Sequence, residues 1–305
     1  MPFSVIITLV ITMKKIIVIV GPTGVGKTKL SIELAKKIDA EIINADSTQI
    51  YRDINIGTAK IKDEEMENIP HHLINIKELT DEYTVYDYQI DARKILDDIF
   101  LRNKTAIIVG GSGLYLSALL YNYNFIKGDN VYDIDSLDNN EMYQLLKEKH
   151  PSLELDKNNR QRLIRAYAKY INNSEEIKSD SGGQTLLYEC SFIGLTTNRD
   201  TLYTKINHRV DKMIEDGLIE EVRTLWNLYP NSKQLSTTIG YKEFKDYIKD
   251  NDYLENVLLN IKQNSRNYAK RQYTWLNHKL EVKWFTTDYE NFSNTVNEVL
   301  SFIKE

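Results

Sequence analysis

The feature that most constrains the fold is the glycine-rich segment GPTGVGKT at residues 21–28, which directly follows the apolar run IIVIV at residues 16–20. A loop of the form G-x-x-x-x-G-K-T between a strand and a helix holds phosphate, because its backbone N–H groups turn inward and the helix N-terminus adds positive potential. Lys27 can reach terminal phosphate oxygens, and the Thr28 hydroxyl can bind Mg²⁺. The loop does not identify the ligand, since every diphosphate carries the same oxygens.

The hydrophobic pattern around this loop predicts the fold class. Buried parallel strands are indicated by apolar, β-branched runs at residues 16–20, 42–45 and 106–109. Leu30, Leu34 and Ile38 recur every four residues, as in a helix that covers a sheet. The alternation predicts an α/β fold with a P-loop NTPase-like, doubly wound parallel sheet. Ligands of such sheets bind at the carboxyl ends of the strands, which here are followed by residues 21–28, 45–47 and 110–115.

Changes in composition predict three parts along the 305-residue chain. Residues 13–120 and 186–305 form the core, with long C-terminal helices. Residues 121–185 are polar with few long apolar runs, and we expect a small helical insertion there. Residues 1–12 are apolar but lack a basic start and a cleavage site, and they are too short to span a bilayer, so we expect an extension and no membrane partner.

The charge distribution suggests a polyanionic partner. The net charge is −5, yet residues 157–169 and 262–279 each carry five basic residues and no acidic one. An acidic body with two concentrated basic segments is compatible with a polyanion bound at one place. The single cysteine, Cys190, excludes an intrachain disulfide and favours the reducing cytoplasm.

Further motifs accompany the phosphate loop. They occur in the order ADSTQIY (45–51), IGTAK (56–60), PHHLI (70–74), VGGSGLY (109–115), QRLIRA (161–166), RVDKMIEDGLIEEV (209–222), TIGYKE (238–243) and YAKRQYTW (268–275). With them, the chain from Lys15 to about Lys279 resembles the tRNA dimethylallyltransferases, bacterial adenosine prenyltransferases. The resemblance implies transfer of a dimethylallyl group from dimethylallyl diphosphate to N6 of the adenine next to the anticodon (position 37). It further implies tRNAs that read codons beginning with U, release of pyrophosphate without consumption of ATP, Mg²⁺ as cofactor and a monomeric enzyme.

The resemblance also assigns roles at the reacting groups. Asp46 is expected to be the base that accepts a proton from the amine, with a Mg²⁺-binding or loop-capping carboxylate as the alternative. Ser112 stands where the family usually has Thr, and its hydroxyl can bond to the diphosphate or the amine; a turn chosen for backbone shape is the alternative. Arg199 can neutralise the leaving group, or form a salt bridge facing solvent. The remaining diphosphate ligands are Gly21, Pro22, Thr23, Gly24, Val25, Gly26, Lys27 and Thr28.

Contacts to tRNA are expected from three regions. The target adenine must leave its stack, and Ser47, Thr48 and Gln49 beside Asp46 can contact its edge. Tyr51 can stack on the adenine, but packing inside the protein is the favoured interpretation. The PHHLI motif is interpreted as structural or RNA-contacting. Lys262, Arg266 and Lys270 lie four residues apart and therefore share a helix face. The tRNA-binding residues are completed by Gln161, Arg162, Leu163, Ile164, Arg165, Lys242, Arg271 and Gln272.

Two other functions stay open at this point. A P-loop kinase of a small molecule or nucleotide also needs a strand ending in an aspartate, as EIINAD does, but it would consume ATP. An RNA-binding protein of the same fold without activity is the second alternative. The presence of Asp46, Lys27 and Thr28 argues against it.

Overall fold

The computed structural model describes residues 15–123, 137–171, 185–250 and 253–304. The chain forms two compact units. The larger unit comprises Met1–Leu120 and Leu187–Glu305, and the smaller unit is the segment Tyr121–Leu186, which separates these two ranges in the sequence. The predicted extension at residues 1–12 lies outside the described residues. None of the described helices combines the length and the apolar content that crossing a membrane requires.

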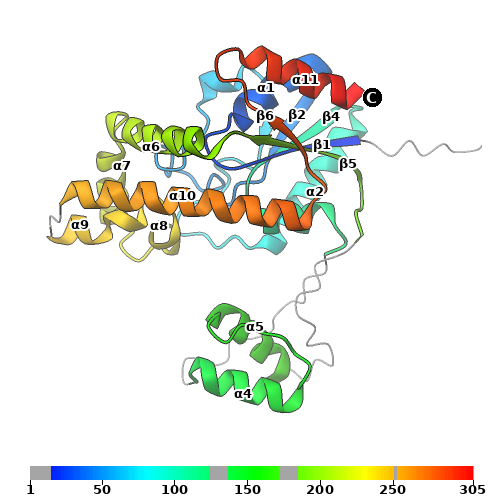
Figure 1. Ribbon diagram of the computed structural model, residues 1–305. Helices are drawn as coiled ribbons and strands as arrows, with labels where there is room; N and C mark the ends of the chain where they lie inside the picture. The colour runs from blue at the N-terminus through cyan, green and yellow to red at the C-terminus, as the bar shows by residue number, and fades with distance from the viewer. Residues whose placement is uncertain (1–14, 124–136, 172–184, 251–252, 305) are drawn as a thin grey trace, which may run out of the picture. The chain divides into compact units, whose positions relative to one another are not determined.

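The larger unit contains a six-stranded sheet in the order β3-β2-β4-β1-β5-β6 among the described residues (Figure 1). Every neighbouring pair is parallel. The strands are β1 (Lys15–Val20), β2 (Ala40–Asn44), β3 (His71–His72), β4 (Thr105–Val109), β5 (Glu189–Thr196) and β6 (Lys283–Thr286). The apolar run at residues 16–20 thus forms a central strand, buried on both faces. The predicted α/β fold with a parallel sheet is confirmed.

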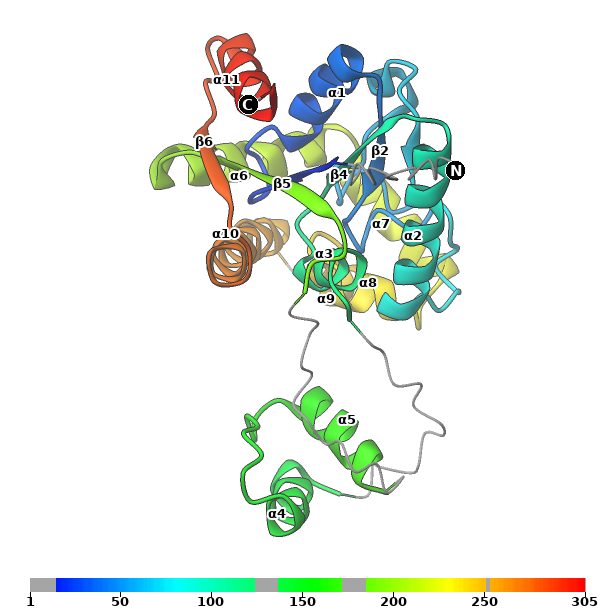
Figure 2. The same ribbon diagram turned by 90° about the vertical axis from the view of Figure 1, so that its right-hand side faces the viewer.

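Helices cover both faces of this sheet. Figure 2 shows α1 and α11 on one face and α2, α3 and α10 on the other. The helices of this unit are α1 (Lys27–Ile38), α2 (Val85–Leu101), α3 (Gly113–Leu120), α6 (Arg199–Glu215), α7 (Leu218–Leu228), α8 (Lys233–Thr237), α9 (Lys245–Asp250), α10 (Leu254–Lys279) and α11 (Phe292–Lys304), with short 3-10 turns at Asp63–Met66 and Lys242–Phe244. The long helix α10 packs along α6 and also contacts α3.

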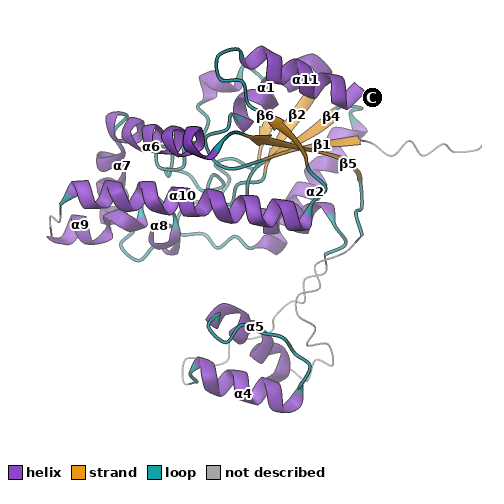
Figure 3. Ribbon diagram, in the orientation of Figure 1, coloured by secondary structure: helices purple, strands orange, loops and turns teal. Residues whose placement is uncertain are grey.

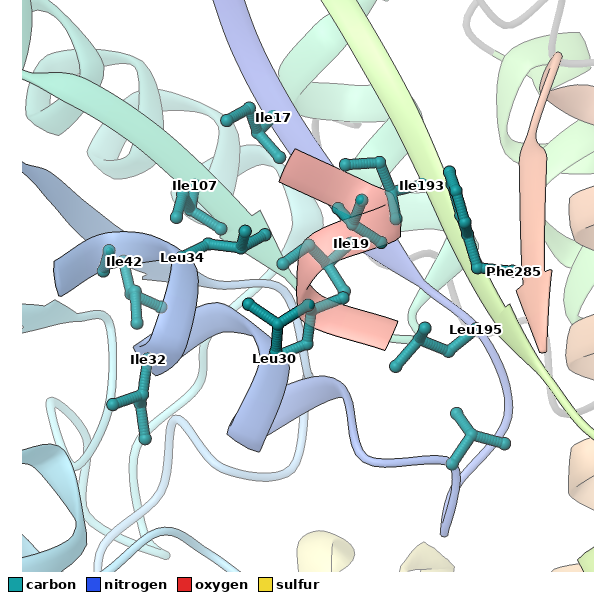
Figure 4. Close-up of a cluster of buried hydrophobic side chains, with 14 of the residues drawn as sticks. Ile17, Ile19, Leu30, Ile32, Leu34, Ile42, Ile107, Ile193, Leu195 and Phe285 are labelled. Carbon is teal, nitrogen blue, oxygen red and sulfur yellow. The ribbon is translucent and has the colours of Figure 1, made fainter. Parts of the chain in front are cut away.

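The core between the sheet and helices α1 and α11 follows from the alternation of side chains along β1. Ile17 and Ile19 point to the face that α1 covers, where they meet Leu30 and Leu34 (Figure 4). Both leucines are fully buried, as their spacing predicts, and Ile38 packs at the edge of the same cluster. This packing fixes the position of α1 and therefore of the phosphate loop that precedes it.

The described part of the smaller unit consists of helices and loops (Figure 3). Its helices are α4 (Asn139–Lys149) and α5 (Arg160–Ile171). The Asp138 side chain caps α4 by accepting from the N–H groups of Asn140 and Glu141. A small core of this unit joins both helices and comprises Met142, Leu146, Leu153, Leu163 and Ala166.

Candidate active site

A cavity of about 590 Å³ opens where the loops after β1, β2 and β4 meet. Parallel strands bring their carboxyl ends to one edge of the sheet, so residues far apart in sequence converge there. Ten of the residues that the sequence singles out line this cavity: Thr23, Lys27, Thr28, Asp46, Ser47, Thr48, Gln49, Lys242, Arg271 and Gln272. All of them belong to the larger unit.

The phosphate loop adopts a conformation that requires glycine. Gly24 and Gly26 have φ angles of 88° and 92°, in the left-handed region that other residues avoid. Gly26 ends the loop as the N-cap of α1, so Lys27 is the first helical residue. The Lys27 ammonium donates to the Pro22 carbonyl oxygen at 2.7 Å, which holds it over the loop.

Two cationic side chains face this loop, and one of them, Arg209 of α6, was missed in the sequence. Arg209 Nη1 donates to Thr23 Oγ1 at 2.6 Å. Burial, and secondly the charge of Arg209, lowers the pKa of Lys27 to about 8, while Asp46 acts in the opposite direction. Burial also lowers the pKa of Arg209. An anion bound between the two cations would relieve this cost.

Arg199, the arginine that the sequence pointed to, does not line the cavity. It is exposed at the start of α6, and its guanidinium lies 5.2 Å from the centre of the Tyr203 ring. Arg209 lies ten residues further along the same helix. It opens the block RVDKMIEDGLIEEV, and this block was the only sequence signal that could have found it.

Asp46 is held by its neighbours so that one carboxylate oxygen stays available. Its backbone N–H donates to Asn44 Oδ1, and Asn44 Nδ2 donates to the Asp46 carbonyl oxygen, both at 3.0 Å. Its Oδ1 accepts from the N–H and the hydroxyl of Thr48, at 2.9 and 2.7 Å. Oδ1 therefore has two donors, and Oδ2 is the oxygen left for a ligand.

Ser112 connects the loop after β4 to the loop after β2. Its Oγ accepts from the Ser47 N–H at 3.1 Å and donates to Ser47 Oγ at 3.3 Å, and its own N–H donates to the Ala45 carbonyl oxygen. A Cβ atom on Gly110 would overlap the Ala45 backbone, so glycine is required for this approach. Ser47 and Ser112, both predicted site residues, are thus hydrogen-bonded to each other.

Gln49 is oriented by the carbonyl oxygen of Thr58, which accepts from Gln49 Nε2 at 3.3 Å and from Arg209 Nη2 at 3.2 Å. Tyr51, in the same wall, is 3% exposed and accepts a hydrogen bond from Gln234, as the packing alternative requires. The Thr58 carbonyl oxygen thereby positions Arg209, which faces the phosphate loop, and Gln49, which lies beside Asp46 in the sequence.

The turn that carries Thr58 is held by a partly buried hydrogen-bond network that the sequence did not reveal. The Glu221 carboxylate accepts from the N–H groups of residues 55–57 at 3.0–3.3 Å and from the Tyr241 hydroxyl at 2.6 Å. The Tyr241 oxygen in turn accepts from the Gly57 N–H at 3.1 Å, and its ring fills the space beside Gly57. The network joins three of the sequence blocks: IGTAK, RVDKMIEDGLIEEV and TIGYKE.

Helix α10 forms another wall of the cavity. Gln272 is buried, and its Nε2 donates to the Gly111 carbonyl oxygen at 3.2 Å. Tyr268 lies one turn earlier, and burial, followed by the charge of Asp46, raises its pKa to about 12. In the sequence, Tyr268 stands out only as the first residue of the block YAKRQYTW.

Only part of the basic face of α10 is free to bind a polyanion. Lys262 pairs with Asp211 at 2.5 Å, and Arg266 donates to Asn207 at 2.7 Å, both partners being on α6. Lys270 is exposed beyond these contacts, and Arg271 is exposed with its guanidinium 5.6 Å from the Tyr268 ring centre. A polyanion would therefore first meet Lys270 and Arg271.

The predicted residues of the insertion are placed as follows. Arg162 is exposed and Ile164 is half-buried. Leu163 is fully buried in the core of this unit, where its side chain packs α5 against α4, and its contact with tRNA stays a prediction. The side chains of Gln161 and Arg165 lie outside the described residues.

The cavity offers oxygen ligands rather than a closed metal site. Within the described ranges, no group of three His, Cys, Asp or Glu side chains is arranged to hold a metal ion. Mg²⁺ takes oxygen ligands, keeps several waters and is often completed by substrate phosphates. The hydroxyl of Thr28 and the carboxylate of Asp46, both at the cavity, fit that mode of binding.

The sequence matches the family model described as IPP transferase over residues 49–279. A tRNA dimethylallyltransferase of Macrococcus caseolyticus is 43% identical, covering 94% of this chain and 96% of the relative. One of Geobacillus thermodenitrificans is 44% identical, covering 95% and 96%.

Solved structures agree with the sequence comparisons. The tRNA delta(2)-isopentenylpyrophosphate transferase of Staphylococcus epidermidis superposes with a TM-score of 0.73 at 38% identity, covering 95% of this chain and 99% of that one. A eukaryotic dimethylallyltransferase acting on tRNA gives a TM-score of 0.79 at 29% identity, covering 95% and 80%. The family model, which matches more than half of the chain, and relatives more than 40% identical over almost all of it show that this chain belongs to the IPP transferase family.

Proposed function

We propose that this protein transfers the dimethylallyl group of dimethylallyl diphosphate to N6 of the adenine next to the anticodon, position 37, in tRNAs that read codons beginning with U. The observation that carries the proposal is one cavity with two cations over a phosphate loop and, at the neighbouring strand end, a carboxylate with one available oxygen. The names of the relatives support the same activity. We expect a monomer that works in the cytoplasm, where tRNA is found.

The diphosphate would bind at the phosphate loop. Lys27, Arg209 and the loop N–H groups neutralise the negative charge that grows on the leaving oxygen as the bond to carbon breaks. Bound Mg²⁺ would add charge neutralisation at the diphosphate, with the Thr28 hydroxyl as its protein ligand. The pKa of Lys27 supports this placement. Burial and the neighbouring Arg209 lower it to about 8 because they disfavour the charged ammonium, and a bound anion would stabilise that charge.

The other substrate would bring its amine to Asp46. The lone pair of an adenine amine is delocalised into the ring, so the amine is a weak nucleophile that needs a base. Its electron pair forms the bond to C1 of the dimethylallyl group, while the C1–O electron pair leaves with pyrophosphate. One N6 proton passes to Asp46 Oδ2, so that the products are the N6-alkylated adenine and pyrophosphate.

The adenine has to leave the anticodon loop to reach this position. Enzymes that modify a base inside a nucleic acid extrude it into a pocket and pay for its unstacking with new contacts. Ser47, Thr48 and Gln49 stand beside Asp46 at the cavity and can supply these contacts. Lys270 and Arg271 would bind phosphates of the anticodon stem.

The decisive experiment mixes the purified protein with Mg²⁺, dimethylallyl diphosphate and unmodified tRNA, without ATP, and analyses the digested nucleosides by mass spectrometry. We expect N6-dimethylallyl adenosine, and its yield should depend on Mg²⁺. No prenylated nucleoside together with ATP turnover on a small acceptor would instead support a P-loop kinase. Binding of tRNA without either product would support an RNA-binding protein.

A further inference from the structure

Two buried side-chain atoms lack a hydrogen-bond partner in the part of the chain that the structure describes: His71 Nε2 and Gln272 Oε1. Both residues line the cavity. Gln272 is only 7% exposed, so water compensates its oxygen poorly. A buried acceptor without a donor costs free energy, and in a binding site it indicates a ligand that supplies the donor.

The orientation of the Gln272 amide is determined by its anchor. Nε2 donates to the carbonyl oxygen of Gly111 at 3.2 Å, and the reversed amide would place two oxygens against each other. A Cβ atom on Gly111 would overlap this amide, so the side chain rests directly on the glycine backbone. Oε1 is therefore the free atom of the amide.

The strand register places this amide at the same level as Asp46. Asn44 of β2 pairs with Val109 of β4, and Asp46 and Gly111 each follow that pair by two residues. His71 instead pairs with Ile42, two residues earlier along β2, on the other side of that strand. Gln272 Oε1, rather than His71 Nε2, is thus the free acceptor at the strand ends that carry the carboxylate.

Of the reacting groups of the two substrates, the amine is the one that can supply the missing donor. An ionised diphosphate and a hydrocarbon tail have no N–H or O–H group, whereas the adenine amine has two N–H groups. Asp46 takes one of them. We propose that Gln272 Oε1 accepts the other N6 hydrogen, which makes Gln272 a catalytic and specificity-determining residue; this inference rests on the function proposed above.

Two consequences follow from such a bond. As the C–N bond forms, positive charge grows on N6, and its remaining N–H becomes a stronger donor, so the bond to Gln272 strengthens in the transition state. A base with an oxygen at position 6 would instead present an acceptor to an acceptor. The site would reject that base by leaving a buried polar group unpaired.

The test compares Gln272→Met, which keeps size and removes the acceptor, with Gln89→Met as a matched control. Gln89 is also 7% exposed and also anchors its Nε2 on a backbone carbonyl group, that of Ala118, but it does not line the cavity. The affinity of each protein is measured for an anticodon stem-loop with adenine at the target position and for the same loop with purine, which lacks the amine. Prenyl transfer at saturating substrates is measured in parallel.

We expect Gln272→Met to lose about 3- to 10-fold of the preference for adenine over purine and about 10- to 100-fold in kcat. Gln89→Met should retain both. Gln272→Glu in its neutral form keeps an acceptor and can still donate to the Gly111 carbonyl oxygen, so it should keep the adenine preference. If the methionine variant does not fold, this variant tests the proposed role of Gln272 instead.

An active wild-type protein whose Gln272→Met variant keeps both kcat and the adenine preference would overturn the inference. Equal losses in both methionine variants would do the same, as would a folded Gln272→Glu protein without the preference. If the wild-type protein itself forms no prenylated adenosine, the proposed function fails, independently of Gln272.

Discussion

Asp46 is the residue on which the proposed chemistry depends most directly. Thr48 donates two hydrogen bonds to one of its oxygens, which leaves the other oxygen available for a ligand. We expect Asp46→Ala to lower kcat by about 10²- to 10⁴-fold, because a positioned base contributes that much, and to leave tRNA binding largely intact. Single-turnover prenyl transfer and filter binding of tRNA measure the two effects. A loss confined to tRNA affinity would refute the assignment of Asp46 as base.

The two arginines of α6 give a second prediction at the residue scale. Arg209→Gln should raise the KM for dimethylallyl diphosphate about 10- to 100-fold, the value of a hydrogen bond to a charged group. Arg199→Gln should change this KM little, because Arg199 is exposed and stacks on Tyr203. Calorimetric titration with pyrophosphate measures binding at the same site without turnover. The reverse order of effects would return the leaving-group role to Arg199.

At the scale of elements, the turn at residues 55–58 depends on its attachment to α7. Glu221→Gln removes a charged acceptor from three backbone N–H groups, and we expect a loss of about 1–3 kcal/mol in the free energy of unfolding. The kcat should fall as well, because the Thr58 carbonyl oxygen then orients Arg209 less well. Glu220→Gln is the matched control, since its side chain is 76% exposed. Urea unfolding and prenyl transfer report the two effects, and an unchanged kcat would show that the turn serves stability alone.

Helix α10 offers a prediction about tRNA affinity. Lys270→Ala should weaken tRNA binding and reduce the slope of log affinity against log salt concentration by about 1, as expected when one phosphate contact is lost. Lys262→Ala should have a smaller effect, because Asp211 already neutralises Lys262. Titrations of tRNA between low and moderate salt distinguish the two variants. A Lys270→Ala defect that persists at saturating tRNA would contradict a phosphate contact.

At the scale of the whole molecule, Glu41 ties β2 to β3 and to the end of α2. It forms an ion pair with Arg102 and a hydrogen bond with His72 while its side chain is only 3% exposed. Hydrogen bonds from Arg102 first, and from His72 second, lower the pKa of Glu41 from 4.5 to about 2. Because the folded-state pKa is depressed, this stabilisation is present above about pH 4.5 and is lost as the pH falls towards 2.

The difference in unfolding free energy between the wild-type protein and Glu41→Gln should therefore shrink across that window. Urea unfolding at several pH values measures it for both proteins. A difference that stays constant from pH 7 to pH 3 would show that these contacts contribute nothing that depends on the charge of Glu41.

The features that could be predicted correctly from the sequence are those that depend on short-range patterns. The apolar runs, the four-residue spacing of Leu30 and Leu34, and the glycine loop each act over a few residues, so they are readable without tertiary contacts. Arg209, Glu221 and Gln272 could not be assigned their contacts in this way. Their roles depend on which helix face meets which strand end.

The sequence by itself therefore determined the parallel α/β fold, the phosphate loop and the family, because each follows from short-range pattern or from motifs in order. Only the tertiary structure decided that Arg209 rather than Arg199 faces the loop, that Leu163 is a core residue, and that a buried amide oxygen stands free at the level of Asp46. The physical reason is that hydrogen bonds and burial are properties of pairs of segments, and such pairs form only when distant parts of the chain pack together.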